Sequence, residues 1–404
     1  MLQLAAPHTR LHSGAPWWLV RDGLPAESAP SRTRCDVAIV GAGITGALVA
    51  DTLTAEGLDV MLIDRRLPGT GSTAVSTALL QYELDVELVD LIAMIGEADA
   101  VRAYRLSAAT LSSIEALTNS FAGRCGFARR TSLYVASRRS HTRRLQAEAE
   151  VRSRAGLDVG FWSGPEVESR FGFRNHGALR TDVAAVVDPL QLTAALLERA
   201  RGGGASVAPW TTALSVELDG TELLLRTDRG PVRADRVVLA CGYEVPPCLE
   251  PSVMSLHCTY AMITDPVEHP GPLGAEYILW ESARPYTYLR MVDDRVVIGG
   301  MDIAHVDDLT RDRLLPGRTR RLERELRRLK PGFDTPTAYS WAGTFGVTRD
   351  GLPIVGPLPG IERVYFALGY GGNGITFGAL AAELLRDLCL DRENDDVRIF
   401  RPGR

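Results

Sequence analysis

The chain has almost no lysine: Lys330 is the only one among 45 lysines and arginines in 404 residues. The six cysteines form no C-x-x-C pair and the seven histidines no H-E-x-x-H pair, so the sequence predicts no disulfide framework and no metal site. Long uncharged runs are also scarce. The one stretch of membrane-like length, 364–382, contains five glycines that would make a poor spanning helix.

Charge excludes further classes of protein. A net charge of −5 gives no overall attraction to nucleic acid or to an anionic membrane. The arginine-rich segment 318–330 is interrupted by Glu323 and Glu325, which favours an amphipathic helix with a solvated face over a polyanion-binding surface. The leader, 1–32, has neither the basic start nor the apolar centre of a secretory signal. We therefore expect a cytoplasmic protein without an integral membrane segment or a nucleic-acid partner.

The most informative motif follows the apolar run 35–40, which predicts a buried strand. Gly41, Gly43 and Gly46 stand at G-x-G-x-x-G spacing, so Ile44 and Thr45 begin a helix. The first glycine permits a tight turn, the second lets a pyrophosphate approach the backbone, and the third lets the helix pack on the strand. The N-terminus of that helix favours phosphate.

A second strand, Val60–Asp64, ends about 20 residues further on, where a carboxylate accepts the ribose hydroxyls of a dinucleotide. Asp64 also disfavours a 2′-phosphate, despite Arg65 and Arg66. A glycine turn alone could be an ordinary turn, but the strand, helix, second strand and acid together favour dinucleotide binding.

Two glycine-rich turns extend this site. Gly71, Ser72 and Thr73 offer amides and hydroxyls to a pyrophosphate, although a surface loop is the alternative. The run 371–374, Gly-Gly-Asn-Gly, lies between the predicted strand 364–368 and a predicted helix that ends near Leu390. Such a run forms a nest of backbone donors at a positive helix end, suited to a negatively charged part of a ligand.

The order of elements predicts an α/β fold with a Rossmann-like dinucleotide domain and a second, mainly antiparallel β substrate domain. We expect the first domain to be discontinuous, from 33–88, 160–242 and 338–404, and the second to comprise 89–159 and 243–337. Alternation without helices over 243–300 indicates the antiparallel sheet. Other expected elements are a helical stretch from the turn at 71–73 through Leu88, a helix over 97–118, a strand over 131–136 and a helix over 190–200 that Pro189 starts.

The whole pattern resembles the FAD-dependent D-amino-acid oxidase superfamily, especially its glycine oxidase, sarcosine oxidase and γ-glutamylputrescine oxidoreductase branch. The fingerprint with Asp64, the turn at 71–73, the segment Val237–Tyr243 and the C-terminal motifs 341–353 and 368–376 carry the resemblance, which spans nearly the entire chain. It implies FAD as cofactor. The expected FAD-binding residues are Gly41, Gly43, Ile44, Thr45, Gly46, Asp64, Arg65, Gly71, Ser72, Thr73, Gly242, Gly343, Asp350, Gly371, Gly372, Asn373, Gly374 and Ile375.

Departures from the family pattern are informative. Some relatives attach FAD through a cysteine where Gly343 stands, and others through a histidine just after the Gly-Ser-Thr turn, where Ala74 and Val75 follow. The resemblance therefore implies non-covalent FAD. Sarcosine-oxidase-like members activate oxygen with a lysine near the flavin, whereas Lys330 belongs to the arginine-rich segment.

The resemblance implies oxidation of a C–N bond in an amine or amino acid by hydride transfer to flavin N5, followed by imine hydrolysis. No separate catalytic residue is assigned, because the flavin carries the chemistry. The electron acceptor would be oxygen, a quinone or another protein, and the sequence is compatible with an oligomer. The alternatives are a flavin-dependent 2-hydroxy acid or glycerol-phosphate dehydrogenase, with His257 or His305 as base, and a flavin-binding subunit of a multi-component dehydrogenase.

Arg290 is the expected substrate anchor. It ends the predicted strand 286–290, which resembles the family strand whose arginine holds the substrate carboxylate, and a guanidinium matches a carboxylate in bidentate geometry. A structural salt bridge to Asp293, Asp294 or Glu281 is the alternative. Tyr82 and Tyr260 are further candidates for the substrate pocket, or else packed aromatics.

Overall fold

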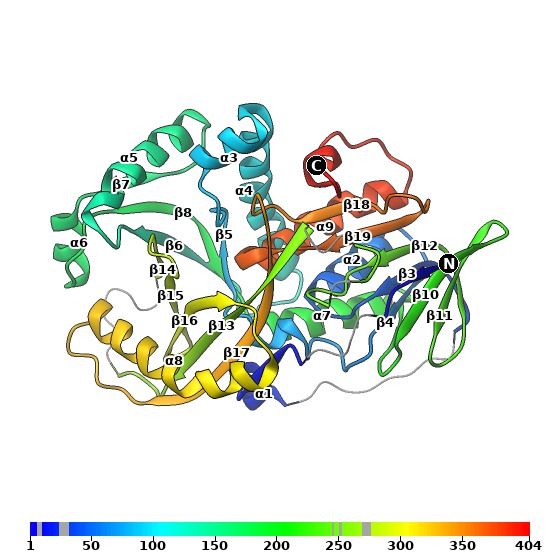
Figure 1. The fold of residues 1–404 in the computed structure, drawn as a ribbon, viewed down its shortest axis with the longest axis horizontal. Coiled ribbons are helices and arrows are strands. Elements are labelled where there is room, and N and C mark those ends of the chain that lie inside the picture. Colours follow the sequence, from blue (N-terminus) through cyan, green and yellow to red (C-terminus); the bar gives the residue numbers. More distant parts are fainter. Residues whose placement is uncertain (6–9, 24–31, 245, 250–252, 269–275) are drawn as a thin grey trace.

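Two large sheets lie side by side in the computed structural model, which describes residues 1–5, 10–23, 32–244, 246–249, 253–268 and 276–404 (Figure 1). One sheet has nine strands and the other ten. Parts of the expected leader, 6–9 and 24–31 with Pro25 and Pro30, lie outside the described residues. The arrangement confirms the predicted fold class: a sheet containing parallel strands beside a mainly antiparallel one.

The nine-stranded sheet is built around five parallel strands, in which neighbouring strands lie in the same direction. These are β3 (Arg34–Val40), β4 (Val60–Ile63), β9 (Ser206–Ala208), β12 (Val232–Leu239) and β19 (Val364–Leu368). Antiparallel strands β1 (Leu2–Gln3), β10 (Ala213–Asp219), β11 (Glu222–Thr227) and β18 (Ile354–Pro357) complete it. Since carboxyl ends of parallel strands share one edge, the segments after β3, β4, β12 and β19 meet there.

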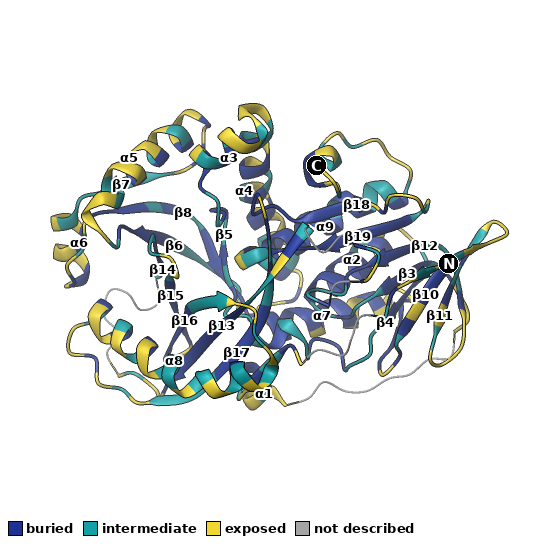
Figure 2. Cartoon of the chain, viewed as in Figure 1, coloured by how far each residue is buried: buried dark blue, intermediate teal, exposed yellow. Residues whose placement is uncertain are grey.

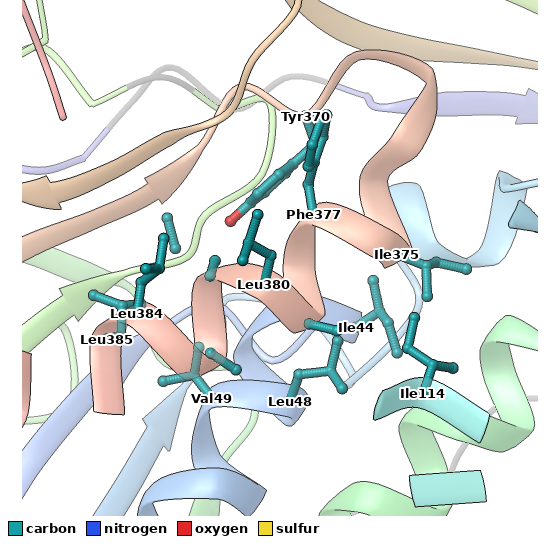
Figure 3. Close-up of a cluster of buried hydrophobic side chains, with 14 of the residues drawn as sticks. Ile44, Leu48, Val49, Ile114, Tyr370, Ile375, Phe377, Leu380, Leu384 and Leu385 are labelled. Carbon is teal, nitrogen blue, oxygen red and sulfur yellow. The ribbon is translucent and has the colours of Figure 1, made fainter. Parts of the chain in front are cut away.

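Helices α2 (Ile44–Ala55), α7 (Pro189–Gly202) and α9 (Gly374–Cys389) form a packed layer together with α4 (Glu97–Asn119). Figure 3 shows Leu48 and Val49 of α2 beside Leu380 and Leu384 of α9. Their side chains are at most 2% exposed. Burial of each such aliphatic side chain stabilises the fold by about 1.5–3 kcal/mol, which fixes the start of α9 relative to the start of α2.

The second sheet is antiparallel except where β14 and β6 pair in parallel. In order, its strands are β2 (His12–Gly14), β17 (Thr337–Thr348), β13 (Met254–Thr264), β16 (Arg295–Ala304), β15 (Thr287–Val292), β14 (Tyr277–Glu281), β6 (Ala128–Val135), β8 (Ala178–Val186) and β5 (Leu79–Gln81), with β7 (Gly160–Trp162) paired to β8. Helix α8 (Asp308–Leu329) packs on β13, β16 and β17.

Helix α8 confirms the interpretation of the arginine-rich segment as an amphipathic helix. Leu322, Leu326 and Leu329 are buried in the core of the second sheet. Figure 2 shows that buried and exposed residues separate in the same way elsewhere in the molecule. Exposed residues lie on the outer faces of α5 (Arg139–Arg154), α6 (Gly164–Phe171) and α8, and buried residues lie along the central strands. The remaining helices are α1 (Trp17–Asp22), α3 (Leu88–Ile95) and α10 (Val397–Phe400).

Two expectations about local structure need correction. The segment from the turn at 71–73 to Leu88 is not one helical stretch: a 3₁₀ turn at Ser72–Val75 is followed by strand β5, and α3 begins at Leu88. Strand pairing also differs from the proposed division 160–242 and 338–404, because β7, β8 and β17 belong to the second sheet. The predicted helix over 97–118 and strands over 131–136 and 364–368 are confirmed.

The uncharged stretch 364–382 forms β19, a glycine turn and the first half of α9. Among the helices of the described ranges, none has the length and hydropathy needed to cross a membrane.

Candidate functional site

A single continuous cavity runs from the carboxyl edge of the parallel strands to the second sheet. At one end it is lined by Gly41, Asp64 and Gly242, which directly or closely follow β3, β4 and β12. At the other end it is lined by Trp280 and Asp302 of the second sheet. The cavity therefore has the position at which open α/β sheets bind ligands, and it extends into the neighbouring sheet.

The fingerprint turn is fixed by close backbone approach. Gly41 has a φ of +111°, and a Cβ there would lie 2.3 Å from the Ala240 carbonyl oxygen. A Cβ at Gly46 would lie 1.9 Å from the Gly41 carbonyl oxygen, so Gly46 allows helix α2 to pack on the turn without itself lining the cavity. Ile44 N–H donates to Thr73 Oγ1 at 3.0 Å and joins the fingerprint to the second turn.

Asp64 lines the cavity directly after β4. Its Oδ2 accepts from Ala42 N–H at 2.7 Å and its Oδ1 from Arg66 N–H at 2.8 Å. Burial raises the pKa of Asp64, while these two hydrogen bonds oppose the rise. Arg66 also forms an ion pair of 2.6 Å with Glu244. The carboxylate is thus held in place by backbone donors and flanked by a neutralised arginine.

The turn at 71–73 and the glycine run at 371–374 both line the cavity. The buried Ser72 Oγ has no hydrogen-bond partner among the described residues, as expected of a donor reserved for a ligand. Asn373 Nδ2 donates to the Glu83 carbonyl at 2.7 Å, which anchors the glycine run to the segment after β5. The run leads straight into α9, whose N-terminus carries partial positive charge.

Most of the residues predicted to bind the cofactor line this cavity. They are Gly41, Gly43, Ile44, Thr45, Asp64, Arg65, Gly71, Ser72, Thr73, Gly242, Gly343, Gly371, Gly372, Asn373, Gly374 and Ile375. Asp350 does not: both its oxygens accept from Arg404, at 2.7 and 2.8 Å, and Oδ1 also accepts from Leu352 N–H. The structure therefore gives Asp350 a role in tethering the C-terminus in place of the expected contact with FAD.

Arg290 lies away from the cavity, contrary to the expected role as substrate anchor. It is 3% exposed, donates from Nη2 to the Val187 carbonyl at 3.0 Å, and lies 5.6 Å from the Trp18 ring centroid. Successive same-face residues of a strand are about 7 Å apart, so Arg290 is one step further along β15 than Tyr288, which does line the cavity. The resemblance identified the right strand, but Arg290 lies two residues beyond Tyr288 and outside the cavity.

The two tyrosines predicted with Arg290 are packed aromatics. Tyr82 donates to the Asp158 carbonyl at 2.8 Å and contacts Tyr104 edge to face. Tyr260 is buried in the core of the second sheet, with the Arg318 guanidinium 5.5 Å from its ring. Neither is among the described residues that line the cavity, which corrects their assignment to the substrate pocket.

The sequence analysis missed the residues that line the far end of the cavity. We call this end the acidic chamber and define it as Asp85, Thr259, Trp280, Tyr286, Tyr288 and Asp302. Tyr286 and Tyr288 were visible as alternating residues of a predicted strand. Asp85 and Asp302 stand in no recognisable motif, because their proximity depends on the pairing of distant strands.

The cavity fits FAD by several independent features. Side-chain-free turns permit close approach at 41–43 and 371–372, a carboxylate lies at the ribose position after β4, and Ser72 offers an unused hydroxyl. A Cβ at Gly343 would lie 3.1 Å from Val75 Cγ2, so this wall is apolar and close-packed. These features define a dinucleotide-binding site.

The comparisons with known proteins agree with this site. The family model described as "FAD dependent oxidoreductase" (DAO) matches residues 36–388, and the chain therefore belongs to that family. "Probable oxidoreductase OrdL" of Rhizobium meliloti (strain 1021) is 24% identical over 384 residues, covering 91% of this chain and 85% of the relative.

Among solved structures, glycine oxidase from Geobacillus kaustophilus superposes with a TM-score of 0.77 at 20% identity, covering 92% of this chain and 99% of that one. L-proline dehydrogenase from P. horikoshii superposes with a TM-score of 0.76 at 17% identity, covering 93% of this chain and 98% of that one. These likenesses show the fold. Together with the family match, they identify an FAD-dependent oxidoreductase with FAD as its cofactor.

Proposed function

We propose that the protein oxidises the C–N bond of an amine or amino acid and that the resulting imine is hydrolysed to a carbonyl compound. One observation carries this proposal: the cavity that begins at Asp64 continues past the glycine run at 371–374 into the acidic chamber. A substrate in the chamber would therefore lie at the end of the cofactor site. When bound, FAD supplies an acceptor for the hydride of the substrate C–H bond.

The chain's own residues bind and position the reactants. The fingerprint turn, Ser72 and Thr73 would hold the pyrophosphate, and Asp64 the ribose. The nest at 371–374 and the N-terminus of α9 would stabilise negative charge at the flavin end. The aromatic side chains of the chamber exclude water around the substrate carbon, which protects the hydride transfer from competing reactions. No protein acid or base is required if the reacting nitrogen enters neutral.

Histidine placement disfavours oxidation of an alcohol, which would require a base beside the reacting carbon. His305 Nδ1 lies 3.7 Å from Cys258 Sγ, and His257 packs beside Phe345 with ring centroids 5.7 Å apart. Within the described part of the chain, neither histidine lines the cavity. Among the described residues, the chamber thus holds no histidine base of the kind expected for the hydroxy acid and glycerol-phosphate alternatives.

The test is turnover of the FAD-bound protein with an artificial dye as acceptor. The panel contains primary and secondary amines, D- and L-amino acids, 2-hydroxy acids and glycerol 3-phosphate. We expect dye reduction with amines or amino acids, together with release of ammonia or an amine in equal amount. Dye reduction by hydroxy acids alone would overturn the proposal. An intact flavin spectrum with no turnover by any compound would instead support the alternative of a subunit that needs a partner.

A further inference from the structure

The acidic chamber is lined by carboxylates and, among the described residues, by no cationic side chain. The cavity-lining residues that the structure describes include two arginines, Arg65 and Arg66, and both flank Asp64 at the opposite end. In the chamber itself the charged side chains are Asp85 and Asp302. A carboxylate substrate would meet two like charges there, whereas a cation would meet two opposite ones.

Asp302 has an unused oxygen. Its Oδ1 is buried and accepts no hydrogen bond from the described residues, although it lines the cavity. A buried carboxylate oxygen without a partner is costly, and a ligand that donates to it would remove that cost. The unsatisfied atom is therefore a second, independent sign of a ligand that carries a hydrogen-bond donor.

Asp85 is held by neutral donors only. Its Oδ1 accepts from the Tyr286 hydroxyl at 3.0 Å and its Oδ2 from Gly372 N–H at 3.0 Å. Arg284 approaches the same residue but donates to its backbone carbonyl, at 3.2 Å, and its guanidinium lies 5.0 Å from the Tyr286 ring centroid. The negative charge of Asp85 therefore has no ion-pair partner in the described structure.

Three aromatic rings wall the chamber. Trp280 stacks on Tyr134 with centroids 3.7 Å apart, which fixes its orientation, and meets Tyr286 nearly edge to face at 6.3 Å. The ring centroids of Tyr288 and Tyr286 are 5.8 Å apart. Burial raises the pKa of both tyrosines, that of Tyr288 to about 12, so both remain neutral at physiological pH. The faces of aromatic rings attract ammonium groups.

We propose that the acidic chamber binds a protonated ammonium group of the substrate, and that this group is separate from the nitrogen whose C–N bond is oxidised. The substrate class is thus a diamine or an amine with a second cationic nitrogen. The inference rests on the proposed amine oxidation. In this proposal the substrate is not held through a carboxylate by Arg290. It is held through its ammonium group by the carboxylates of Asp85 and Asp302 and by the aromatic wall of Trp280, Tyr286 and Tyr288.

Electron balance requires that the reacting nitrogen be unprotonated. The C–H bond beside the reacting nitrogen breaks with both electrons leaving as hydride to FAD, and the lone pair of that nitrogen completes the C=N bond. A protonated nitrogen has no lone pair to give. An ammonium that keeps its proton between Asp85 and Asp302 consequently cannot be the reacting group, and a second nitrogen of the substrate must react. Water then hydrolyses the imine to a carbonyl compound and an amine or ammonia.

The test uses the FAD-bound protein and anaerobic flavin reduction by compounds of matched length: butane-1,4-diamine, butylamine and 4-aminobutanoate, with longer diamines to vary the spacing. We expect the diamine series to half-saturate at concentrations at least about tenfold below butylamine, with 4-aminobutanoate weakest. Asp302→Asn and Asp85→Asn should remove that advantage, so that the diamines and butylamine half-saturate each variant at similar concentrations. Asp334→Asn, a change at an exposed carboxylate, should preserve it.

The inference is overturned if 4-aminobutanoate or amino acids half-saturate at lower concentration than diamines, or if Asp302→Asn leaves the diamine advantage intact. A carboxylate preference that Arg284→Met abolishes would assign recognition to Arg284. Should the aspartate variants lose FAD, perturbation of the wild-type flavin spectrum by tetramethylammonium against acetate decides the matter: tighter binding of the cation supports the inference, and tighter binding of the anion contradicts it. Reduction by hydroxy acids alone would contradict the proposed function, and the ion comparison would still test the chamber.

Discussion

Asp85 and Gly372 are joined by a hydrogen bond of 3.0 Å between the Asp85 carboxylate and the Gly372 backbone N–H, although 287 positions separate them in the chain. Gly372 belongs to the nest at the start of α9, and Asp85 follows β5 of the second sheet. A Cβ at Gly372 would lie 3.3 Å from the same carboxylate oxygen. This contact connects the two sheets where the cofactor end of the cavity meets the acidic chamber.

Gly41→Ala should weaken FAD binding and lower the free energy of unfolding, because its Cβ would lie 2.3 Å from the Ala240 carbonyl oxygen. Gly57→Ala is the matched control: it also has a positive φ, of +86°, but nothing lies within 4 Å of its Cβ. Both variants suffer about 1–2 kcal/mol of backbone strain. Overpacking at Gly41 adds about 1–3 kcal/mol. Chemical denaturation and FAD titration check this, and equal losses in both variants would contradict it.

Asp64→Ala should weaken FAD binding by about 1–3 kcal/mol, the cost of losing a charge-assisted hydrogen bond to the ribose. The variant also leaves Ala42 N–H and Arg66 N–H without their acceptor, so unfolding of the FAD-free protein must be measured alongside. Asp334→Asn is again the control. FAD affinity that stays at the wild-type value in Asp64→Ala would show that this carboxylate does not contact the cofactor.

Arg290→Met should leave the KM for every substrate within about twofold, because Arg290 bonds to the Val187 carbonyl away from the cavity. Burial lowers the pKa of Arg290 to about 9, which indicates that its charge is poorly compensated. Replacement of such a group by an apolar side chain of similar length is often neutral or stabilising, so the melting temperature should not fall. Steady-state kinetics with a carboxylate and a non-carboxylate amine check this. A rise in KM confined to the carboxylate would restore Arg290 as an anchor.

FAD should be released intact when the protein is precipitated with acid, since the positions that carry covalent flavin in some relatives hold Gly343, Ala74 and Val75 here. Val75 Cγ2 packs against the backbone of Gly343, and neither residue carries a nucleophilic side chain. Absorbance of the supernatant and the pellet measures the partition. Flavin that stays with the precipitated chain would contradict this prediction.

The stability of the FAD-free protein should depend on Asp302 in a defined pH window. Burial raises the pKa of Asp302 to about 6, the Thr259 hydroxyl opposes the rise, and Asp85 adds to it, with weaker opposition from Arg284 and Arg318. The folded state therefore holds a proton that the unfolded chain releases near pH 4. The contribution to the free energy of unfolding is full below about pH 4 and is lost as the pH rises through about 6.

The measurement is the difference in free energy of unfolding between wild type and Asp302→Asn from pH 4 to pH 7. Wild type should become less stable relative to Asp302→Asn as the pH rises, because Oδ1 of the ionised Asp302 accepts no hydrogen bond from the described residues. A saturating diamine should reduce this shift in the FAD-bound form. A pH-independent difference, or one that shifts towards wild type, would contradict the assignment.

The cofactor half of the site could be predicted from the sequence because its determinants are local. Gly41, Gly43 and Asp64 stand at fixed spacing around one strand–helix–strand unit, and the glycine run sits between a clear strand and a clear helix. Backbone chemistry at each position allows few residue types, so the pattern is visible without the fold.

The substrate half could not be predicted in the same way. Asp302 reaches the cavity from β16 and Asp85 from the segment after β5, and their proximity depends on a ten-stranded sheet whose order the sequence does not state. Arg290 illustrates the limit, since its strand was recognised while its distance along that strand relative to the cavity was not. The same non-local pairing explains why β8 and β17, which lie in segments predicted for the first domain, belong to the second sheet.

The central claim is that this FAD site removes hydride from carbon bonded to nitrogen. The most direct measurement is anaerobic reduction of the FAD-bound protein by matched pairs that differ only in that atom, such as butylamine against butan-1-ol and alanine against lactate, followed by loss of flavin absorbance in a stopped-flow instrument. The account predicts that the nitrogen member of at least one pair bleaches the flavin while its oxygen counterpart does not. Bleaching by the oxygen members with none by the nitrogen members would contradict it.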